Sequence, residues 1–308
     1  MSLYYDLSII LISAFGLWWG ALWVVESASR IAKKLGLSEL VIGLTVVAFA
    51  TSAPEFAVTV TAALQGQSAI SVGNVVGSNI FNMGIILGLI TLFSGVATNR
   101  MFFYRDGFLL VGTGLLLLLF FRDHLLELYE GILLFSTLVI YIIVLIRNKE
   151  KIEDDEVPEG DFKWSDIPKL IGGVGIIITS ANFLVESATS LARIIGISEW
   201  VIGITIVAAG TSLPELATSM VALYKGRHGI SIGNLIGSDL FNMLGVLGVA
   251  AMLKPLAIAS DDYFSLFLLA GNLAILLLFI RTRWKITRTE GIILMILALF
   301  RWFYDFIF

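Results

Sequence analysis

Two glutamates stand in the middle of apolar stretches, each directly after a proline. Glu55 follows Pro54 in ATSAPEFAVT, and Glu215 follows Pro214 in GTSLPELATS. Proline lacks an N–H, so it leaves the carbonyl four residues earlier without its helical hydrogen bond and breaks the helix. A carboxylate, hydroxyl groups and freed carbonyls then lie at one break, and all of these oxygens are potential cation ligands. The hydroxyls belong to Thr51, Ser52, Thr211 and Ser212.

A second set of polar residues recurs at a spacing of four. Residues four apart share one face of a helix. The two stripes are Asn74, Ser78 and Asn82, and then Asn234, Ser238 and Asn242. Small residues in membrane helices also serve packing alone, but with the glutamates nearby we expect ligands at Ser78, Asn82, Ser238 and Asn242. Asn74 and Asn234 lie a turn further away.

Every candidate ligand atom is an oxygen. The chain has no cysteine, and His124 and His228 fall in expected loops. Oxygen-only sites suit hard cations, and a flexible set of about six to eight oxygens suits calcium better than magnesium. The pattern therefore predicts a site for a hard, calcium-like cation and no resident cofactor.

The composition places these residues in a membrane. Of the 308 residues 58% are hydrophobic and 14% charged, and the mean hydropathy is +0.94, whereas soluble domains carry about 25% charge. An acid at the bilayer centre costs at least about 2.5–3.5 kcal/mol. Two such acids at equivalent places indicate a compensating cation, and one divalent ion neutralises the pair.

Runs of about 20 apolar residues, each long enough to span a bilayer, recur along the chain. The expected spans are 6–29, 39–64, 69–97, 106–121, 125–146, 167–192, 199–224, 229–253, 263–280 and 290–307. With the N-terminus outside, all of the 20 Lys and Arg residues except Arg122, Arg193, Lys254 and Arg301 face inward. The positive-inside rule thus predicts a cell-membrane protein with both termini extracellular.

The chain repeats itself after 160 residues. Between 41–84 and 201–244, 22 of 44 positions are identical without a gap. Each half holds five expected helices, an odd number, so the second copy must be inverted relative to the first, as in secondary transporters with a site between their repeats. We therefore predict an all-α fold of ten transmembrane helices, with helices 2 and 7 broken. The first repeat covers 1–146, an acidic cytoplasmic linker 147–166, and the second repeat 167–308.

Two other acidic features have simpler interpretations. Glu26 and Glu186 also recur, but they stand near helix ends, and we interpret them as interfacial or gating residues. The linker carries the run EDDE at 153–156. This run lacks the spacing and glycine of an EF-hand loop, so a solvated loop is favoured over a calcium sensor.

The paired motifs ATSAPE with GSNIFN, and GTSLPE with GSDLFN, resemble the two α-repeats of the sodium/calcium exchangers within the cation/calcium exchanger superfamily. The resemblance covers nearly the whole chain. It implies Glu55 and Glu215 as calcium ligands, helped by Thr51 and Thr211 largely through backbone oxygens. It further implies flanking sodium sites and a sliding gate of helices 1 and 6. The sodium sites would use Ser52, Ser78, Ser212, Ser238 and carbonyls such as those of Ala48 and Ala208, with Asn82 and Asn242 completing the centre.

One departure concerns the acid of the second stripe. Some microbial members and the potassium-dependent branch carry an aspartate where this chain has Asn242. Here the acid stands three residues earlier, at Asp239, where the first repeat has Asn79. The two positions are about 60° apart on a helix, so Asp239 can still face the site. Stoichiometry and potassium dependence stay open, and the large regulatory insertion of eukaryotic exchangers is missing.

The favoured interpretation is a secondary antiporter in which one set of oxygens holds either one Ca²⁺ or several Na⁺ and switches only when occupied. The alternative is proton/calcium exchange, since burial raises the pKa of a glutamate; the hydroxyl and amide ligands favour an alkali ion instead. A membrane enzyme would need a nucleophile with a base, or a His/Cys metal site, and neither is present. The inverted repeats argue against a channel. Beyond Ca²⁺, Na⁺ and the bilayer, the sequence indicates no partner, and no nucleic acid.

Overall fold

The computed structural model describes residues 3–148, 161–196, 206, 208–260 and 262–307. The chain divides into two compact units, and each unit draws on both halves of the sequence. Unit 1 comprises Met1–Thr51 with Lys149–Asn234, and unit 2 comprises Ser52–Asn148 with Leu235–Phe308. The sequence repeats and the compact units are thus different divisions of the same chain. Most of the expected linker, 149–160, lies outside the described residues.

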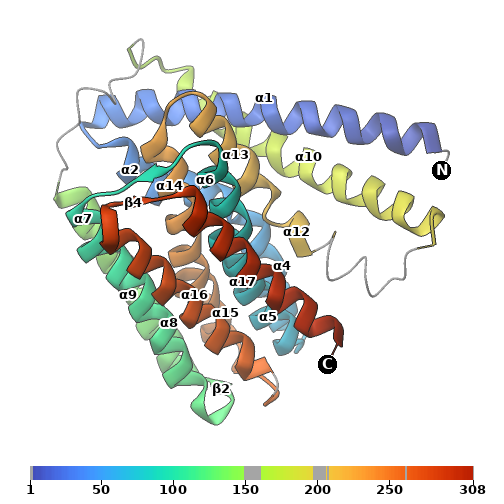
Figure 1. The fold of residues 1–308 in the computed structure, drawn as a ribbon, viewed down its shortest axis with the longest axis vertical. Helices are drawn as coiled ribbons and strands as arrows, with labels where there is room; N and C mark the ends of the chain where they lie inside the picture. The colour runs from blue at the N-terminus through green and yellow to red at the C-terminus, as the bar shows by residue number, and fades with distance from the viewer. Residues whose placement is uncertain (1–2, 149–160, 197–205, 207, 261, 308) are drawn as a thin grey trace. The chain divides into compact units, whose positions relative to one another are not determined.

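Unit 1 is built around two long helices that run alongside one another, α1 (Leu3–Leu35) and α10 (Asp166–Ile194) (Figure 1, blue and yellow). Their backbones touch: a Cβ on Gly20 would stand 2.8 Å from the carbonyl oxygen of Gly173. Glycine is therefore needed here for close approach.

Polar contacts hold this helix pair at both ends. Ser190 Oγ donates to Asp6 Oδ2 over 2.9 Å, and Arg30 NH1 lies 3.1 Å from Oδ1 of the buried Asp166. Asp6 and Asp166 are equivalent in the sequence repeat. Asp6 accepts a hydrogen bond from a hydroxyl, whereas Asp166 pairs with a guanidinium.

The rest of unit 1 consists of short helical pieces packed on this pair. They are α2 (Glu39–Ile42), η1 (Gly43–Val47), α3 (Ala48–Thr51), α12 (Ala208–Gly210), α13 (Leu213–Tyr224) and the first part of α14 (His228–Leu240). Val24 and Val25 of α1, Ile177 of α10 and Val221 of α13 belong to one buried apolar cluster. This cluster anchors the segment that carries Glu215.

Unit 2 contains the remaining helices. They are α4 (Ala53–Leu64), α5 (Ser68–Ile80), η2 (Phe81–Ile86), α6 (Leu87–Phe93), α7 (Arg100–Phe102), η3 (Phe103–Gly107), α8 (Phe108–Phe120), η4 (Phe121–Asp123), α9 (Leu128–Arg147), the end of α14, η7 (Phe241–Val246), α15 (Leu247–Leu253), α16 (Asp262–Arg283) and α17 (Arg288–Ile307). The helix α4 packs on α5 and α15, and α17 packs on α6 and η2.

Two short antiparallel strand pairs connect distant parts of unit 2. The strand β1 (Val96–Ala97) pairs with β4 (Lys285–Ile286), and β2 (Leu125–Leu126) pairs with β3 (Leu256–Ala257). A shift of 160 residues converts one pair into the other, because 96 becomes 256 and 125 becomes 285. The inverted repeat therefore extends beyond the motifs into the loops.

The predicted breaks in helices 2 and 7 are confirmed. The helix α4 begins after Ser52 and α13 after Ser212, both with ψ of 7°, and each proline stands in the first turn of the new helix. Proline is tolerated in that turn because its missing N–H would have no helical partner there. The breaks thus place Glu55 and Glu215 in the first turns of α4 and α13.

Seven described helices are long and apolar enough to cross a membrane, and the broken pair Glu39–Thr51 with Ala53–Leu64 forms an eighth span. The start of the expected span 199–224 lies outside the described residues. The expected span 290–307 is helical within α17. The described helices agree with the ten-span prediction.

Candidate cation site

In unit 2, Glu55 is fully buried and its backbone is held by a neighbouring helix. Asn74 on α5 donates from Nδ2 to the Glu55 carbonyl oxygen over 3.3 Å and to Thr59 Oγ1 over 3.0 Å. Ser71 Oγ donates to the carbonyl oxygen of Thr59 over 3.0 Å. The first turns of α4 are thereby fixed against α5, which positions the carboxylate one residue beyond the proline.

Unit 1 repeats this arrangement around Glu215, which is also fully buried. Asn234 Nδ2 on α14 donates to the Glu215 carbonyl oxygen over 3.4 Å and to Ser219 Oγ over 3.0 Å. Ser231 Oγ donates to the carbonyl oxygen of Ser219 over 2.9 Å. Each glutamate thus sits on a helix clamped by an asparagine and a serine at equivalent positions.

These contacts give Asn74 and Asn234 a role that their spacing alone did not reveal. Their amide nitrogens hold backbone and hydroxyl oxygens of the glutamate helix, so they position the glutamates. Thr59 and Ser219 were not singled out in the sequence. The available signal was the repeat itself, since 59 and 219 are 160 apart and both carry hydroxyls.

Thr51 is tied to the same network in unit 1. Its Oγ1 donates to Asn234 Oδ1 over 3.0 Å and lies 3.3 Å from the carbonyl oxygen of Ala48. Through Asn234, the hydroxyl of the first break is connected to the backbone of Glu215. The structure thus brings together three predicted site residues of unit 1, Ala48, Thr51 and Glu215.

In unit 2 the predicted stripes are linked by amide hydrogen bonds. Asn82 Nδ2 donates to Asp239 Oδ1 over 3.0 Å. Asn242 Nδ2 donates to Ser78 Oγ over 3.3 Å and to Asn79 Oδ1 over 3.2 Å. All five side chains are at most 2% exposed. The structure therefore brings Ser78, Asn82, Asp239 and Asn242 together.

Asn79 was noted only as the counterpart of Asp239, and the structure gives it a definite place. Its Nδ2 donates to the backbone carbonyl of Asp239 over 3.3 Å while its Oδ1 accepts from Asn242. The repeat-equivalent residues 79 and 239 thus meet directly. Asn79 serves as a bridge and supplies no oxygen beyond those already bonded.

Asn82 and Asn242, the two asparagines predicted as ligands, occupy π-helical turns in η2 and η7. Such wider turns are rare and frequently occur at functional sites. Their amide nitrogens donate inside the protein, whereas Asn82 Oδ1 and Asn242 Oδ1 are buried and accept no hydrogen bond from the residues that the structure describes. Buried oxygens of this kind fit a cation, whose coordination would satisfy them.

The remaining predicted residues are placed as follows. Ser52 and Ser212 stand at the two breaks and Ser238 on α14, all fully buried, and Thr211 directly precedes Ser212. The backbone of Ala208 begins α12, and its side chain lies outside the described residues. Within the described ranges no group of three or more His, Asp or Glu forms a metal cluster. A cation here would depend on hydroxyl, amide and carbonyl oxygens beside the carboxylates.

Glu26 lies away from this network. Its Oε1 accepts from Lys225 Nζ over 2.9 Å, its Oε2 is 3.8 Å from Arg30 NH2, and its side chain is 43% exposed. Glu186 is also exposed. The interfacial or gating role of the two residues stays a prediction.

Comparison with known proteins places this geometry in a family. The model of the family described as sodium/calcium exchanger protein matches residues 5–147 and 168–304. The sodium/calcium exchanger MaX1 of Methanosarcina acetivorans is 35% identical over 322 residues, which cover 90% of this chain and 91% of that protein. The inner membrane protein YrbG of Escherichia coli K12 is 34% identical over 245 residues, 75% of each chain.

A solved structure gives the same result at the level of the fold. The sodium-calcium exchanger NCX_Mj superimposes with a TM-score of 0.85 at 28% identity, covering 97% of this chain and 98% of that one. The matched segments of the family model lie on either side of the central loop and contain every predicted site residue. The chain is a multi-pass membrane antiporter, and it belongs to the sodium/calcium exchanger family.

Proposed function

We propose that this chain exchanges Ca²⁺ for several Na⁺ by alternating access, with Glu55 and Glu215 as the calcium ligands. The observation that carries the proposal is the duplicated clamp, in which Asn74 and Asn234 each hold the backbone of a fully buried glutamate. A buried carboxylate whose position is fixed so closely is suited to bind a cation that is repeatedly desolvated and released.

The other oxygens complete the proposed ligand set. Thr51 and Thr211 contribute backbone oxygens to calcium. The sodium ions use hydroxyls and carbonyls beside the breaks and on the stripes, and amide oxygens complete the centre. This set consists of Ser52, Ser78, Ser212, Ser238, the carbonyls of Ala48 and Ala208, and the side chains of Asn82 and Asn242, with Asp239 as a further carboxylate.

The proposed mechanism is competition for shared oxygens. One Ca²⁺ or several Na⁺ neutralise the buried carboxylates, and the cost of leaving these charges uncompensated prevents the empty protein from switching. If three Na⁺ exchange for one Ca²⁺, one net charge crosses, and each 100 mV contributes about 2.3 kcal/mol to the cycle.

The proposed topology follows from charge. We place both termini outside and the loop 147–166 in the cytoplasm, between a first repeat at 1–146 and a second at 167–308. The supporting observation is the distribution of Lys and Arg between alternate loops of the chain.

The decisive experiment measures ⁴⁵Ca²⁺ uptake into proteoliposomes that contain the purified protein. Uptake should require Na⁺ inside the vesicles and should fall to background when choline replaces it. Net positive charge leaves the vesicle when several Na⁺ exit for each Ca²⁺ that enters. A valinomycin-imposed potential that favours the outward movement of positive charge should therefore accelerate uptake. Uptake driven by an outward proton gradient without Na⁺ would refute the sodium coupling and establish proton exchange instead.

A further inference from the structure

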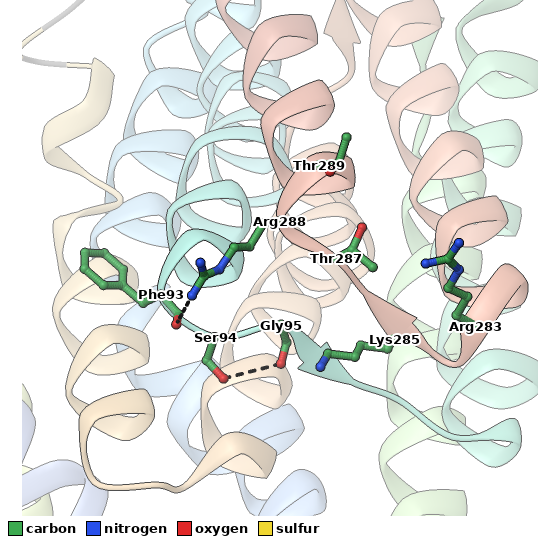
Figure 2. A pocket seen from close by; sticks show the side chains of 8 residues that line it. All are labelled: Phe93, Ser94, Gly95, Arg283, Lys285, Thr287, Arg288 and Thr289. Atoms are coloured by element: carbon green, nitrogen blue, oxygen red, sulfur yellow. Dashed lines mark hydrogen bonds between the residues drawn. The ribbon is translucent and has the colours of Figure 1, made fainter.

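An open cavity of about 700 Å³ lies in unit 2 beside the pair β1–β4, and neither Glu55 nor Asp239 lines it (Figure 2). Two of the helices that are long and apolar enough to cross a membrane end at it, since Ser68–Phe93 ends at Phe93 and Asp262–Arg283 ends at Arg283. The cavity is therefore at the level where apolar spans give way to polar loops. Its walls are Phe93, Ser94, Gly95, Arg283, Lys285, Thr287, Arg288 and Thr289.

The walls of the cavity combine cations with hydroxyl groups. Arg283, Lys285 and Arg288 form no ion pair with a carboxylate in the described part of the chain. Arg288 NH2 makes only a long contact, 3.5 Å, with the carbonyl oxygen of Phe93 (Figure 2). Ser94, Thr287 and Thr289 add hydroxyl groups around the same space.

The acid that follows this loop in the chain, Glu290, already accepts hydrogen bonds at the start of α17. Glu290 Oε2 accepts from Thr287 N over 2.7 Å and from Thr287 Oγ1 over 2.8 Å, so it caps the start of α17. Two further cations flank the loop, because Arg100 and Arg281 lie 5.9 Å and 5.3 Å from the ring centroid of Trp284. The local field is strongly positive.

The inverted repeat supplies an internal control for these charges. The equivalent loop has the same strand pair, β2–β3, and the same type of cap, with Glu130 Oε2 accepting from Glu127 N over 2.9 Å. The positions equivalent to Arg283, Lys285 and Arg288 are Asp123, Leu125 and Leu128. The scaffold therefore forms without the three cations. The positive-inside rule alone would account for cations in the loop, but not for all three of them lining one cavity together with Ser94 and Thr289.

We propose that this cavity binds a phosphate group, carried by an anionic phospholipid or by a soluble phosphate. Guanidinium groups match phosphate oxygens in bidentate geometry, and basic pockets at the ends of membrane helices bind anionic headgroups. Phe93, which is 66% exposed, offers apolar surface at the cavity, as acyl chains at an interface require.

The test compares binding of three probes to the detergent-purified full chain. Native mass spectrometry measures retention of phosphatidylglycerol and of phosphatidylcholine with identical acyl chains, and inorganic phosphate is added as a competitor. The test variant is Arg283→Gln/Lys285→Gln/Arg288→Gln, and the control Arg147→Gln/Lys163→Gln/Lys169→Gln removes the same charge elsewhere. A second variant, Ser94→Phe, places a ring at the wall of the cavity and keeps its cations.

Wild type and control should retain phosphatidylglycerol in preference to phosphatidylcholine, and both test variants should bind it about tenfold more weakly. Displacement by millimolar inorganic phosphate identifies a soluble phosphate as the ligand, and its absence identifies the lipid. The proposal would be overturned if wild type, the triple variant and Ser94→Phe all bound phosphatidylglycerol equally and were all equally affected by inorganic phosphate. Size-exclusion profiles verify that each variant is folded, and Ser94→Phe decides the outcome if the triple variant is not.

Discussion

Asn82 donates a hydrogen bond from Nδ2 to Oδ1 of Asp239 over 3.0 Å, and both side chains are fully buried in unit 2. Asp239, which stands where the first repeat has Asn79, is thus in direct contact with a proposed ligand, Asn82. Asp239 could instead line an access path and attract cations without coordinating them, but a residue in that role would be exposed to water, and Asp239 is buried.

For Asp239→Asn we expect a change in the number of Na⁺ exchanged per Ca²⁺, because one negative charge leaves the proposed site. The reversal potential of exchange in proteoliposomes measures this ratio directly. An unchanged reversal potential with weaker apparent affinity would mean that Asp239 attracts cations without coordinating them. If neither quantity changes, Asp239 is structural.

Glu55→Gln and Glu215→Gln should each abolish calcium transport while the protein stays folded. Glutamine keeps the shape of the side chain but leaves a doubly charged ion facing one carboxylate fewer, and uncompensated charge is costly in a buried site. Calcium uptake and thermal unfolding of the purified variants measure the two effects separately. The isosteric exchange Asp161→Asn, at a side chain that is 94% exposed, serves as the control and should retain transport.

Sodium should displace bound calcium at millimolar to molar concentration, because both ions use the same oxygens. A calcium titration by calorimetry at increasing Na⁺ should show an apparent Kd that rises without a plateau. Independent binding of the two ions, with a Kd insensitive to Na⁺, would contradict the proposed competition.

Asn74→Ala and Asn234→Ala should each weaken apparent calcium affinity by at least about tenfold, because the first removes two buried hydrogen bonds and the second three, each worth about 1 kcal/mol. The effect is indirect, through the backbone of Glu55 or Glu215. Calcium KM should rise more than the maximal rate falls. Thr137→Ala provides the comparison, since its Oγ1 donates to Leu133 on an exposed face of α9, and it should leave KM unchanged.

Arg30→Gln should lower the unfolding temperature more than Ser190→Ala does. The first change leaves the buried Asp166 without its guanidinium, and an uncompensated buried charge costs about 1–3 kcal/mol or more. The second removes only one hydroxyl donor from Asp6. Thermal denaturation in detergent compares the two ends of the α1–α10 pair, and equal shifts would mean that the ion pair adds nothing beyond a hydrogen bond.

The sequence predicted the helical fold, the repeat and the breaks well, because each has a strong local signal. Pro54 and Pro214 cannot continue a helix, and the stripes from Asn74 and Asn234 follow helical spacing. The amide contacts of Asn79 could not be predicted, since they join residues 160 positions apart on different helices. The π-turns at Asn82 and Asn242 also leave no local pattern, because they depend on how neighbouring helices pack.

The strand pair β1–β4 has a consequence for biosynthesis. Val96 pairs with Ile286, so 190 residues must be made between one partner and the other. At about 5–20 residues per second, a ribosome takes about 10–40 s to supply the second partner. During that interval β1 and its neighbours in unit 2 are in the membrane without their final contacts. Completion of this unit is therefore a post-insertion event that awaits nearly the last helix, and a chain truncated after the first repeat would leave it unfinished.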